Sequence, residues 1–411
     1  MTRRAAFLLL LCALAACRED APAPQPQKQP EPAAAVIAAT PGNDEDNSLN
    51  LLYGAAVVSR DGELHLETSA VHTIDGFAET LWTSAPGVPE DTIVYSMLAP
   101  TRLQRVGIST NAGDDAMESV AFDTSMDGKR WTELATLKVA RTDQRQFVDL
   151  KTPVVAQYLR VRTIDPPHRY YVRLRGVHAI GEEVGPPQTP PFTGCWRING
   201  ELAHLVQNGA RITGTIAGNP PTSIEGGTDN RVGMIMWMRG PTFGYAAITR
   251  SPDGAHLSGL SFFEEADKNI GEGWFGERCA DGRESGGDGL RTPKELFARA
   301  KRLSLYGVVF DSSDRVVEDV SAPALDAVAA LIATSPQRLR IVAHELRYPT
   351  PEQNRAHATA RLQSIRAALE KHGVNVARIE FANAGDDAGG IVVRSSLQRA
   401  LLSRVDLVSG T

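Results

Sequence analysis

The sequence predicts a multidomain protein rich in β-structure: a β-sandwich, then a small antiparallel sheet or barrel, then an α/β domain. Short β-prone runs separated by turn signals fill residues 48–182, and hairpin signals continue through 192–281. From residue 293 to 411, strand-like patterns alternate with helical ones. The length of 411 residues suits about two to four domains.

The overall composition is that of a globular protein. Hydrophobic residues make up 42% of the chain and the formal net charge is −6. No strong polybasic stretch is present, which argues against DNA or RNA as a partner.

The first residues have the pattern of an export signal. Arg3 and Arg4 precede an apolar run that is too short to span a membrane, and small residues follow it. Leu14-Ala15-Ala16-Cys17 resembles the bacterial lipobox, which implies removal of residues 1–16 and lipidation of Cys17. Arg18 is not the aspartate associated with inner-membrane retention, so the resemblance implies an outer-membrane anchor facing the periplasm. An ordinary signal with an incidental cysteine is the alternative.

Residues 17–47 predict a tether. The stretch is dense in Pro, Ala, Gln and charged residues and cannot bury enough apolar surface to fold. Its proline content indicates a semi-extended segment that holds the folded part away from the membrane.

The segment 48–182 predicts an antiparallel sandwich. Turn signals separate β-prone runs at fairly regular intervals; the runs are Thr92–Met97, Arg105–Ser109, Ser119–Thr124, Gln146–Leu150 and Tyr158–Thr163.

Three local strings in this segment resemble the discoidin-like domain, the galactose-binding jelly roll also found as coagulation-factor C-type domains. They are Ile74-Asp75-Gly76 with Thr80 and Trp82, Ser125-Met126-Asp127-Gly128 with Trp131, and Gln157-Tyr158-Leu159-Arg160-Val161. The resemblance implies a structural calcium ion, the one cofactor predicted for this chain, at Asp75, Gly76 and Thr80. Calcium takes about six to eight oxygens, so backbone carbonyls would have to complete the shell. A plain turn is the alternative.

Ligands of the discoidin-like family bind at loops on one end of the sandwich, so the resemblance implies a glycan partner there. Aromatic and cationic groups suited to a sugar occur at His168-Arg169-Tyr170-Tyr171 and at Arg141 and Arg145. Alternation explains part of this pattern equally well as a last strand, with Tyr171, Arg173 and Arg175 on its solvent face and Tyr170, Val172 and Leu174 on the other.

Pro186–Pro191 reads as a stiff linker, and a meander of hairpins occupies 192–281. Arg231–Met238 reads as a strand with Val232, Met234 and Met236 on one side. We expect side chains to fill the centre if the sheet closes.

Four cysteines are present, and two of them fall in the N-terminal signal and lipobox. Cys195 and Cys279 remain at the two ends of the hairpin segment, where a disulfide would join its first strand to its last in an oxidising periplasm. A pair of free thiols is the alternative.

Residues 293–411 predict a strand, a helix, a strand, a helix and further strands. The expected elements include strands at Leu303–Phe310, Arg338–Val342, Val376–Phe381 and Arg404–Leu407, a helix from Ser321 and Pro323 facing inward with Leu325, Val328 and Ile332, and a helix from Pro351 to Gly373. Thr350 would cap this last helix, and Leu362, Ile365 and Leu369 would form its buried face.

The unit from Ile341 to Gly373 resembles the OmpA-like peptidoglycan-binding domain. His344 falls on the motif's His, Leu346 on its Asp, and Asn354 and Arg361 on its Asn and its ligand-gripping Arg. In that family the Asp and the Arg hold the amine and carboxylate of a diaminopimelate residue. Here the Asp is missing.

The remaining motif residues can still bind the carboxylate of the ligand, although the partner of its amine is missing. Arg361 can take a carboxylate through two charge-assisted hydrogen bonds. Glu345 lies one residue away, on the opposite face of the strand, so it replaces the Asp only if the strand end twists or bulges. The resemblance implies peptidoglycan binding by Arg361, Asn354 and Glu345.

The chain carries no motif of an enzyme in a convincing context. His344-Glu345 starts like a zinc-protease helix, but Tyr348 stands where the second His is required. We therefore predict a non-catalytic, lipid-anchored protein that tethers the outer membrane to peptidoglycan. The alternative is an envelope scaffold that has lost wall binding and meets a periplasmic protein or a glycan through the discoidin-like domain. A small-ligand carrier that uses the middle barrel is a third class.

Overall fold

The computed structural model describes residues 35–37, 46–86, 91–113, 117–164, 171–264, 270–280, 293–389 and 393–410. The predicted signal peptide, Cys17 and almost all of the predicted tether lie outside these residues. Pro32–Thr411 forms one compact unit, which contains all of the described residues. Among the described helices, none combines the length and the apolar character needed to cross a membrane.

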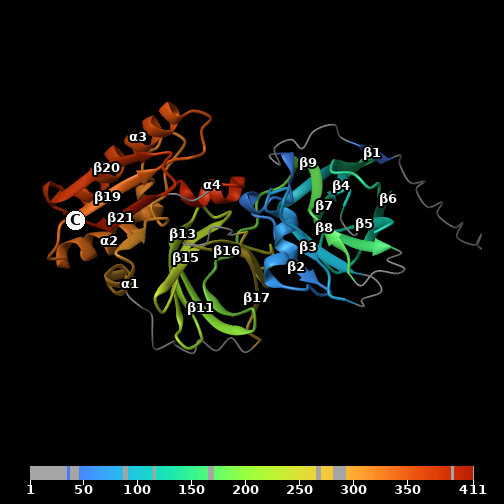
Figure 1. The fold of residues 1–411 in the computed structure, drawn as a ribbon, viewed down its shortest axis with the longest axis horizontal. Coiled ribbons are helices and arrows are strands. Elements are labelled where there is room, and N and C mark those ends of the chain that lie inside the picture. Colours follow the sequence, from blue (N-terminus) through green and yellow to red (C-terminus); the bar gives the residue numbers. More distant parts are fainter. Residues whose placement is uncertain are drawn as a thin grey trace, which may run out of the picture. The chain divides into compact units, whose positions relative to one another are not determined.

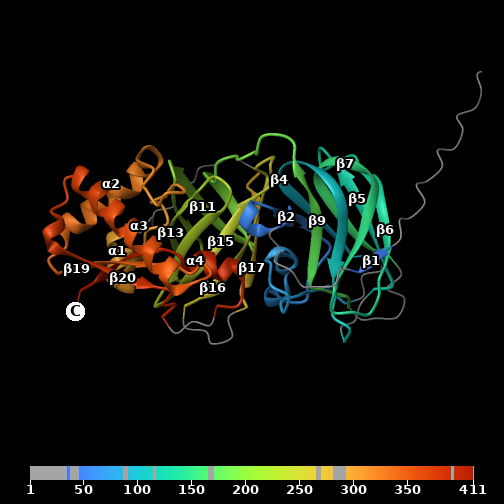
Figure 2. The same ribbon diagram turned by 90° about the horizontal axis from the view of Figure 1, so that it is seen from above.

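The first part of this unit is a two-layered antiparallel β-sandwich, drawn as the blue-to-green strands of Figures 1 and 2. The strand order is β2-β4-β7-β5-β6, with β1 paired to β7 and β9 paired to β4. The strands are β1 (Ala35–Ile37), β2 (Ala56–Arg60), β4 (Thr92–Ser109), β5 (Ser119–Ser125), β6 (Thr132–Lys138), β7 (Arg145–Ile164) and β9 (Gly176–Glu183). Short elements complete it: η2 (Leu51–Tyr53), η3 (Leu66–Thr68), η4 (Ala70–Ile74), and β3 (Trp82–Thr83), which pairs with β8 (Arg173–Leu174).

Two long strands replace four of the predicted short ones. β4 contains both predicted runs between Thr92 and Ser109, and β7 contains both runs between Gln146 and Thr163. The register of β4 shifts between Ser96 and Thr101, around Pro100, because proline has no N–H to donate to the ladder. The halves on either side of this shift pair with different neighbours, so each long strand takes part in both layers.

The predicted hairpin segment forms a closed eight-stranded barrel. Its strands are β10 (Gly194–Ile198), β11 (Glu201–Asn208), β12 (Arg211–Ile216), β13 (Thr222–Thr228), β14 (Gly233–Arg239), β15 (Thr242–Arg250), β16 (His256–Phe263) and β17 (Glu272–Arg278). Trp196, Ile212 and Ile235 belong to one apolar cluster, while Val232, Met236 and Tyr245 belong to another that includes the sandwich core. Alternate residues of β14 are therefore buried on opposite faces, as period-2 geometry requires.

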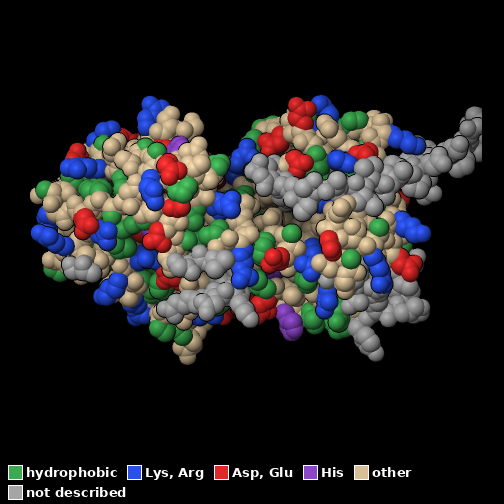
Figure 3. All heavy atoms as spheres, turned by 45° about the horizontal axis from the view of Figure 1, so that its top comes forward, with side chains coloured by type: hydrophobic (Ala, Val, Ile, Leu, Met, Phe, Trp, Pro, Cys, Tyr) green, Lys and Arg blue, Asp and Glu red, His purple; other side chains and the backbone are tan. Residues whose placement is uncertain are grey.

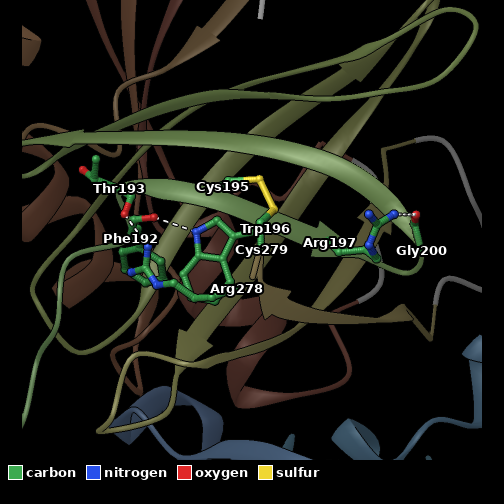
Figure 4. Close-up of a disulfide and its surroundings, with 8 residues drawn as sticks. All are labelled: Phe192, Thr193, Cys195, Trp196, Arg197, Gly200, Arg278 and Cys279. Carbon is green, nitrogen blue, oxygen red and sulfur yellow. Dashed lines mark hydrogen bonds between the residues drawn. A yellow bond between two sulfur atoms is a disulfide. The ribbon is translucent and has the colours of Figure 1, made fainter. Parts of the chain in front are cut away.

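The disulfide prediction is confirmed. Cys195 lies on β10 and Cys279 directly follows β17, and their Sγ atoms are bonded with Cα atoms 5.5 Å apart. Figure 4 shows Arg278 against the ring of Trp196, with its guanidinium carbon 4.3 Å from the ring centroid. The Trp196 indole N–H donates to the carbonyl of Phe192 at 2.8 Å. The disulfide thus joins the first and last strands of the barrel.

The C-terminal part has a four-stranded sheet in the order β18-β21-β19-β20. The strands are β18 (Arg302–Ser304), β19 (Leu339–His344), β20 (Ile379–Gly385) and β21 (Val405–Ser409); the helices are α1 (Pro293–Ala300), α2 (Glu318–Thr334), α3 (Pro351–Lys371) and α4 (Ser396–Leu402), with a short η5 (Val376–Arg378). β19 and β20 are parallel, and β21 is antiparallel to β18 and β19. The predicted cap of α3 is confirmed, because Thr350 and Gln353 form a reciprocal capping box.

Three predicted boundaries in this part are wrong. The strand predicted from Leu303 ends at Ser304. The helix predicted from Ser321 starts at Glu318, because the Ser321 hydroxyl accepts a hydrogen bond from Val309 N instead of capping the helix. The strand predicted from Val376 starts at Ile379, because the Asn375 side chain accepts from Ala377 N and closes a 3-10 turn.

Apolar residues of the C-terminal part share cores with the barrel. Met238 of β14 belongs to the core of the α/β part, while Leu397 and Leu401 of α4 belong to the cluster that contains Tyr245 of β15. The Arg404 guanidinium also donates to the Tyr245 hydroxyl at 3.0 Å. Residues 293–411 taken alone would expose these apolar side chains.

Candidate functional site

Several loops of the sandwich meet at one end. The pairings Thr92↔Arg162 and Ser119↔Ile164 bring one set of strand ends together, and Ser109↔Arg145 brings together another. Residues 171–175 join the two sets, because Arg175 N donates to Ser109 O at 2.9 Å and Val172 O accepts from Ser84 N at 2.9 Å. Hydrogen bonds join the loops: Ala112 N donates to Asp143 Oδ1 at 2.8 Å. We call this edge, formed by the described parts of 75–91, 110–118, 139–144 and 171–175, the loop end.

Tyr171 and Arg173 form an aromatic and cationic pair at the loop end. The Arg173 guanidinium carbon lies 5.0 Å from the Tyr171 ring centroid, and both residues are partly exposed. Val172 and Leu174, which alternate with them, are buried. The predicted alternation is confirmed for these four residues, and it directs Tyr171 and Arg173 toward solvent.

The other predicted ligand residues differ in their surroundings. Arg141 is exposed and makes no hydrogen bond or ion pair among the described residues. Arg145 is mostly covered and lies 3.6 Å from Asp46 Oδ1, which ties it to the start of the sandwich. Residues 168–170 lie outside the described residues.

Asp91 was missed by the sequence analysis. Its carboxyl is buried at the loop end, next to β4, and its Oδ1 has no hydrogen-bond partner. Burial raises the pKa of Asp91 to about 6; the nearby Asp61 adds to this effect, and a hydrogen bond from Ser84 opposes it. The sequence signal for this position is an acidic residue directly before the predicted strand that starts at Thr92.

Asp75 and Thr80 are buried at the two ends of a turn in which Gly76 is exposed. The Asp75 carboxylate accepts hydrogen bonds from Phe77 N at 2.8 Å and from the Thr80 hydroxyl, and it lies 3.0 Å from His72 Nδ1. Burial raises the pKa of Asp75, although His72 opposes the shift. Hydrogen bonds within this turn satisfy the Asp75 carboxylate and the Thr80 hydroxyl without a metal ion. Calcium binding at this turn stays a prediction. Within the described residues, no cluster of three or more His, Cys, Asp or Glu side chains is arranged to hold a metal ion.

In the C-terminal part, Arg361 and Glu345 lie together. Glu345 continues the alternation of the buried residues Leu339, Ile341 and Ala343, so it lies on the face of β19 that packs against α3. The expected twist or bulge of this strand end is therefore not required, because the extra residue of the register shift is on β20. Arg361 Nη1 lies 2.6 Å from Glu345 Oε2, and Arg361 Nε donates to Asp314 Oδ1 at 2.9 Å. Arg347 donates to both carboxylate oxygens of Glu345.

The charges of this cluster are largely satisfied from within. Burial alone would raise the pKa of Glu345, but Arg347 and Arg361 outweigh it and lower the pKa to about 2. The side-chain amide of Asn354 is also hydrogen-bonded within the protein: its Oδ1 accepts from Tyr348 N and its Nδ2 donates to Tyr348 O. Leu346 donates its N–H to the Ser403 hydroxyl. Peptidoglycan binding by Arg361, Asn354 and Glu345 stays a prediction.

Residues 58–175 match the family model of the F5/8 type C domain. The discoidin-like prediction is therefore confirmed for this part of the chain.

Solved structures of low sequence identity resemble about a third of the chain. The C-terminal domain of a chitobiase from Bacteroides fragilis is 20% identical, with 32% of this chain and 96% of that chain covered and a TM-score of 0.30. CBM32-3 from a family 31 glycoside hydrolase of Clostridium perfringens is 17% identical, with coverages of 34% and 97% and a TM-score of 0.30. The family 32 CBM of Clostridium perfringens NanJ, solved in complex with galactose, is 13% identical, with coverages of 31% and 93% and a TM-score of 0.27. No curated protein matches the chain.

Proposed function

We propose that this chain is a non-catalytic envelope protein that binds a glycan at the loop end of its discoidin-like domain. The match of residues 58–175 to the F5/8 type C domain carries the proposal. The exposed pair Tyr171 and Arg173 at the loop end supports it.

The chemistry of the loop end suits a sugar. An aromatic face such as that of Tyr171 packs against the apolar C–H face of a pyranose, and guanidinium groups donate to its hydroxyls. Arg141 and Arg173 are the guanidinium groups at hand. The Asp91 side chain is buried beneath the loops, so we do not expect it to contact the sugar directly. We propose instead that it supports the loops from below.

The location of the protein rests on the N-terminal motif. We infer that lipid on Cys17 anchors the chain in the outer membrane and that the Pro-rich stretch after it holds the compact unit in the periplasm. On the face drawn in Figure 3, acidic and basic side chains are interspersed. This distribution suits a soluble unit held near a membrane by lipid.

Binding of the compact unit Pro32–Thr411 to immobilised neutral, amino and acidic oligosaccharides tests the glycan proposal. We expect at least one class to bind, and we expect Tyr171→Ala and Arg173→Ala each to weaken binding about tenfold. Arg130→Ala is the matched control, because Arg130 is 92% exposed in the turn between β5 and β6, away from the loop end. Binding that Arg130→Ala weakens as much as Arg173→Ala would place the site elsewhere.

A wall tether through the C-terminal part is the second candidate. The observation that favours it is the position of the Glu345 carboxylate, 2.6 Å from Arg361 Nη1, which supplies a carboxylate next to the position of the missing Asp of the OmpA-like motif.

Cosedimentation of Pro32–Thr411 with peptidoglycan sacculi tests this candidate. Leu346→Asp, which restores the motif's aspartate, should increase retention. Absence of retention for both the parent and Leu346→Asp would refute the tether and leave the glycan proposal unaffected.

A further inference from the structure

A pocket of about 370 Å³ lies where the barrel and the C-terminal part meet within the compact unit. Its walls come from Gly227–Met234 of the barrel, from Leu305–Phe310, and from Ala400–Val405 at the junction of α4 and β21. Arg347, Arg361 and Leu52 of η2 complete the lining. The volume is at the small end of the range for ligand pockets, about 300–1,000 Å³.

Three guanidinium groups line the pocket, from Arg347, Arg361 and Arg404. Their carboxylate partners Glu345, Asp314 and Asp406 are buried and are not part of the lining. Asp229 is the one acidic side chain in the described lining, and its Oδ1 is already an acceptor for Arg231 N and Val232 N.

Two of these guanidinium groups keep unused donors. Arg361 uses Nε and Nη1 for Asp314 and Glu345, and Arg347 uses Nε and Nη2 for Glu345. Arg361 Nη2 and Arg347 Nη1 make no hydrogen bond with any described residue. Because a guanidinium has five N–H groups in a fixed plane, the buried carboxylates hold these donors in place without consuming them.

The rest of the lining is mainly apolar. Val232 and Met234 contribute from the barrel, and Val308 and Phe310 contribute from the C-terminal part. We propose that this pocket binds a small amphiphilic anion, with its carboxylate or phosphate head at Arg347 and Arg361 and its apolar body against these walls.

Calorimetric titration of Pro32–Thr411 with decanoate, decyl phosphate and decanol tests the proposal. Decanoate, decyl phosphate or both should bind, and which of them binds identifies the source of the anion. Decanol has the same apolar chain without the charge, and we expect its affinity to be at least about tenfold lower. Equal affinity for decanol, or no binding of either anion, would overturn the proposal.

Two pairs of variants locate the site. Ala400→Phe should fill the pocket and abolish binding, whereas Ser396→Phe, at an exposed position of the same helix, should leave binding unchanged. Arg347→Gln should weaken anion binding about tenfold, whereas Arg315→Gln, at a 76% exposed side chain outside the lining, should not. Anion binding that survives both Ala400→Phe and Arg347→Gln would overturn the assignment to this pocket.

Discussion

Replacing Arg361 with alanine would remove the guanidinium that two buried carboxylates share. Arg361 is only 7% exposed, and its contacts to Glu345 and Asp314 measure 2.6 Å and 2.9 Å. A buried ion pair that loses one partner costs about 3–5 kcal/mol. Glu345 keeps Arg347 as a partner, so we expect the lower end, a loss of about 3 kcal/mol in the free energy of unfolding.

The same substitution should change the response of stability to acid. The pKa of Glu345 is about 2 in the folded chain and about 4.3 in an unfolded one. The ionised carboxylate therefore contributes stability above about pH 4.3, and this contribution is lost as the pH falls through about 2. Without Arg361 the pKa depression is smaller, so Arg361→Ala should lose less stability over this window than the parent.

Urea unfolding of Pro32–Thr411, followed by tryptophan fluorescence and far-ultraviolet circular dichroism at pH 7 and pH 3, measures both effects. Arg315→Ala is the control, because it removes an exposed guanidinium from a surface pair and should leave the unfolding midpoint unchanged. An unfolding free energy for Arg361→Ala equal to that of the parent at pH 7 would refute the structural role of Arg361. An equal acid sensitivity of the two proteins would refute the electrostatic part of the reasoning.

Three further predictions concern the sandwich and the barrel. Replacing Cys195 and Cys279 with serine opens a loop with a sequence separation of 84, and chain entropy predicts a loss of about 4.5 kcal/mol, measurable by denaturant unfolding; a loss below about 1 kcal/mol would contradict it. Burial raises the pKa of Asp91 to about 6, so the folded state holds a proton that the unfolded state releases from about pH 4, and stability should fall as the pH rises through this window. Asp91→Asn should flatten that decline in a melting-temperature series, and an unchanged slope would exclude Asp91 as its source. Calcium binding at Asp75, Gly76 and Thr80 predicts a higher melting temperature in calcium than in EDTA, with no difference in Asp75→Asn; equal melting temperatures for the parent would refute this site.

Local chemistry accounts for what the sequence predicts well. The capping box of Thr350 and Gln353 lies within four residues, so the start of α3 follows from a short motif. Alternation of Tyr171, Val172, Arg173 and Leu174 predicts which side chains are buried, because the period of a strand is two. The disulfide of Cys195 and Cys279 follows from the exclusion of the other two cysteines rather than from any contact.

Contacts between distant segments account for what the sequence does not predict. Asp314, which holds Arg361, lies 47 residues before it in a loop that carries no recognisable motif. Glu345 follows the buried Leu339, Ile341 and Ala343 onto the face of β19 that packs against α3, but which face packs against α3 depends on contacts between the two elements. Burial of the outer face of β14 depends on its packing against the sandwich core, which no local pattern encodes.

The contacts of Arg361 also separate the two ligands considered for the C-terminal part. A wall carboxylate gripped in the OmpA-like manner would have to share Arg361 with Glu345 and Asp314, and Asn354 would have to leave its bonds to Tyr348. Displacing a buried, hydrogen-bonded partner costs about as much free energy as the new contact with the wall carboxylate contributes. Such binding would therefore be weak. An anion that meets Arg361 Nη2 and Arg347 Nη1 breaks none of these bonds. The internal pairing that disfavours the wall ligand therefore favours a small anion in the pocket beside it.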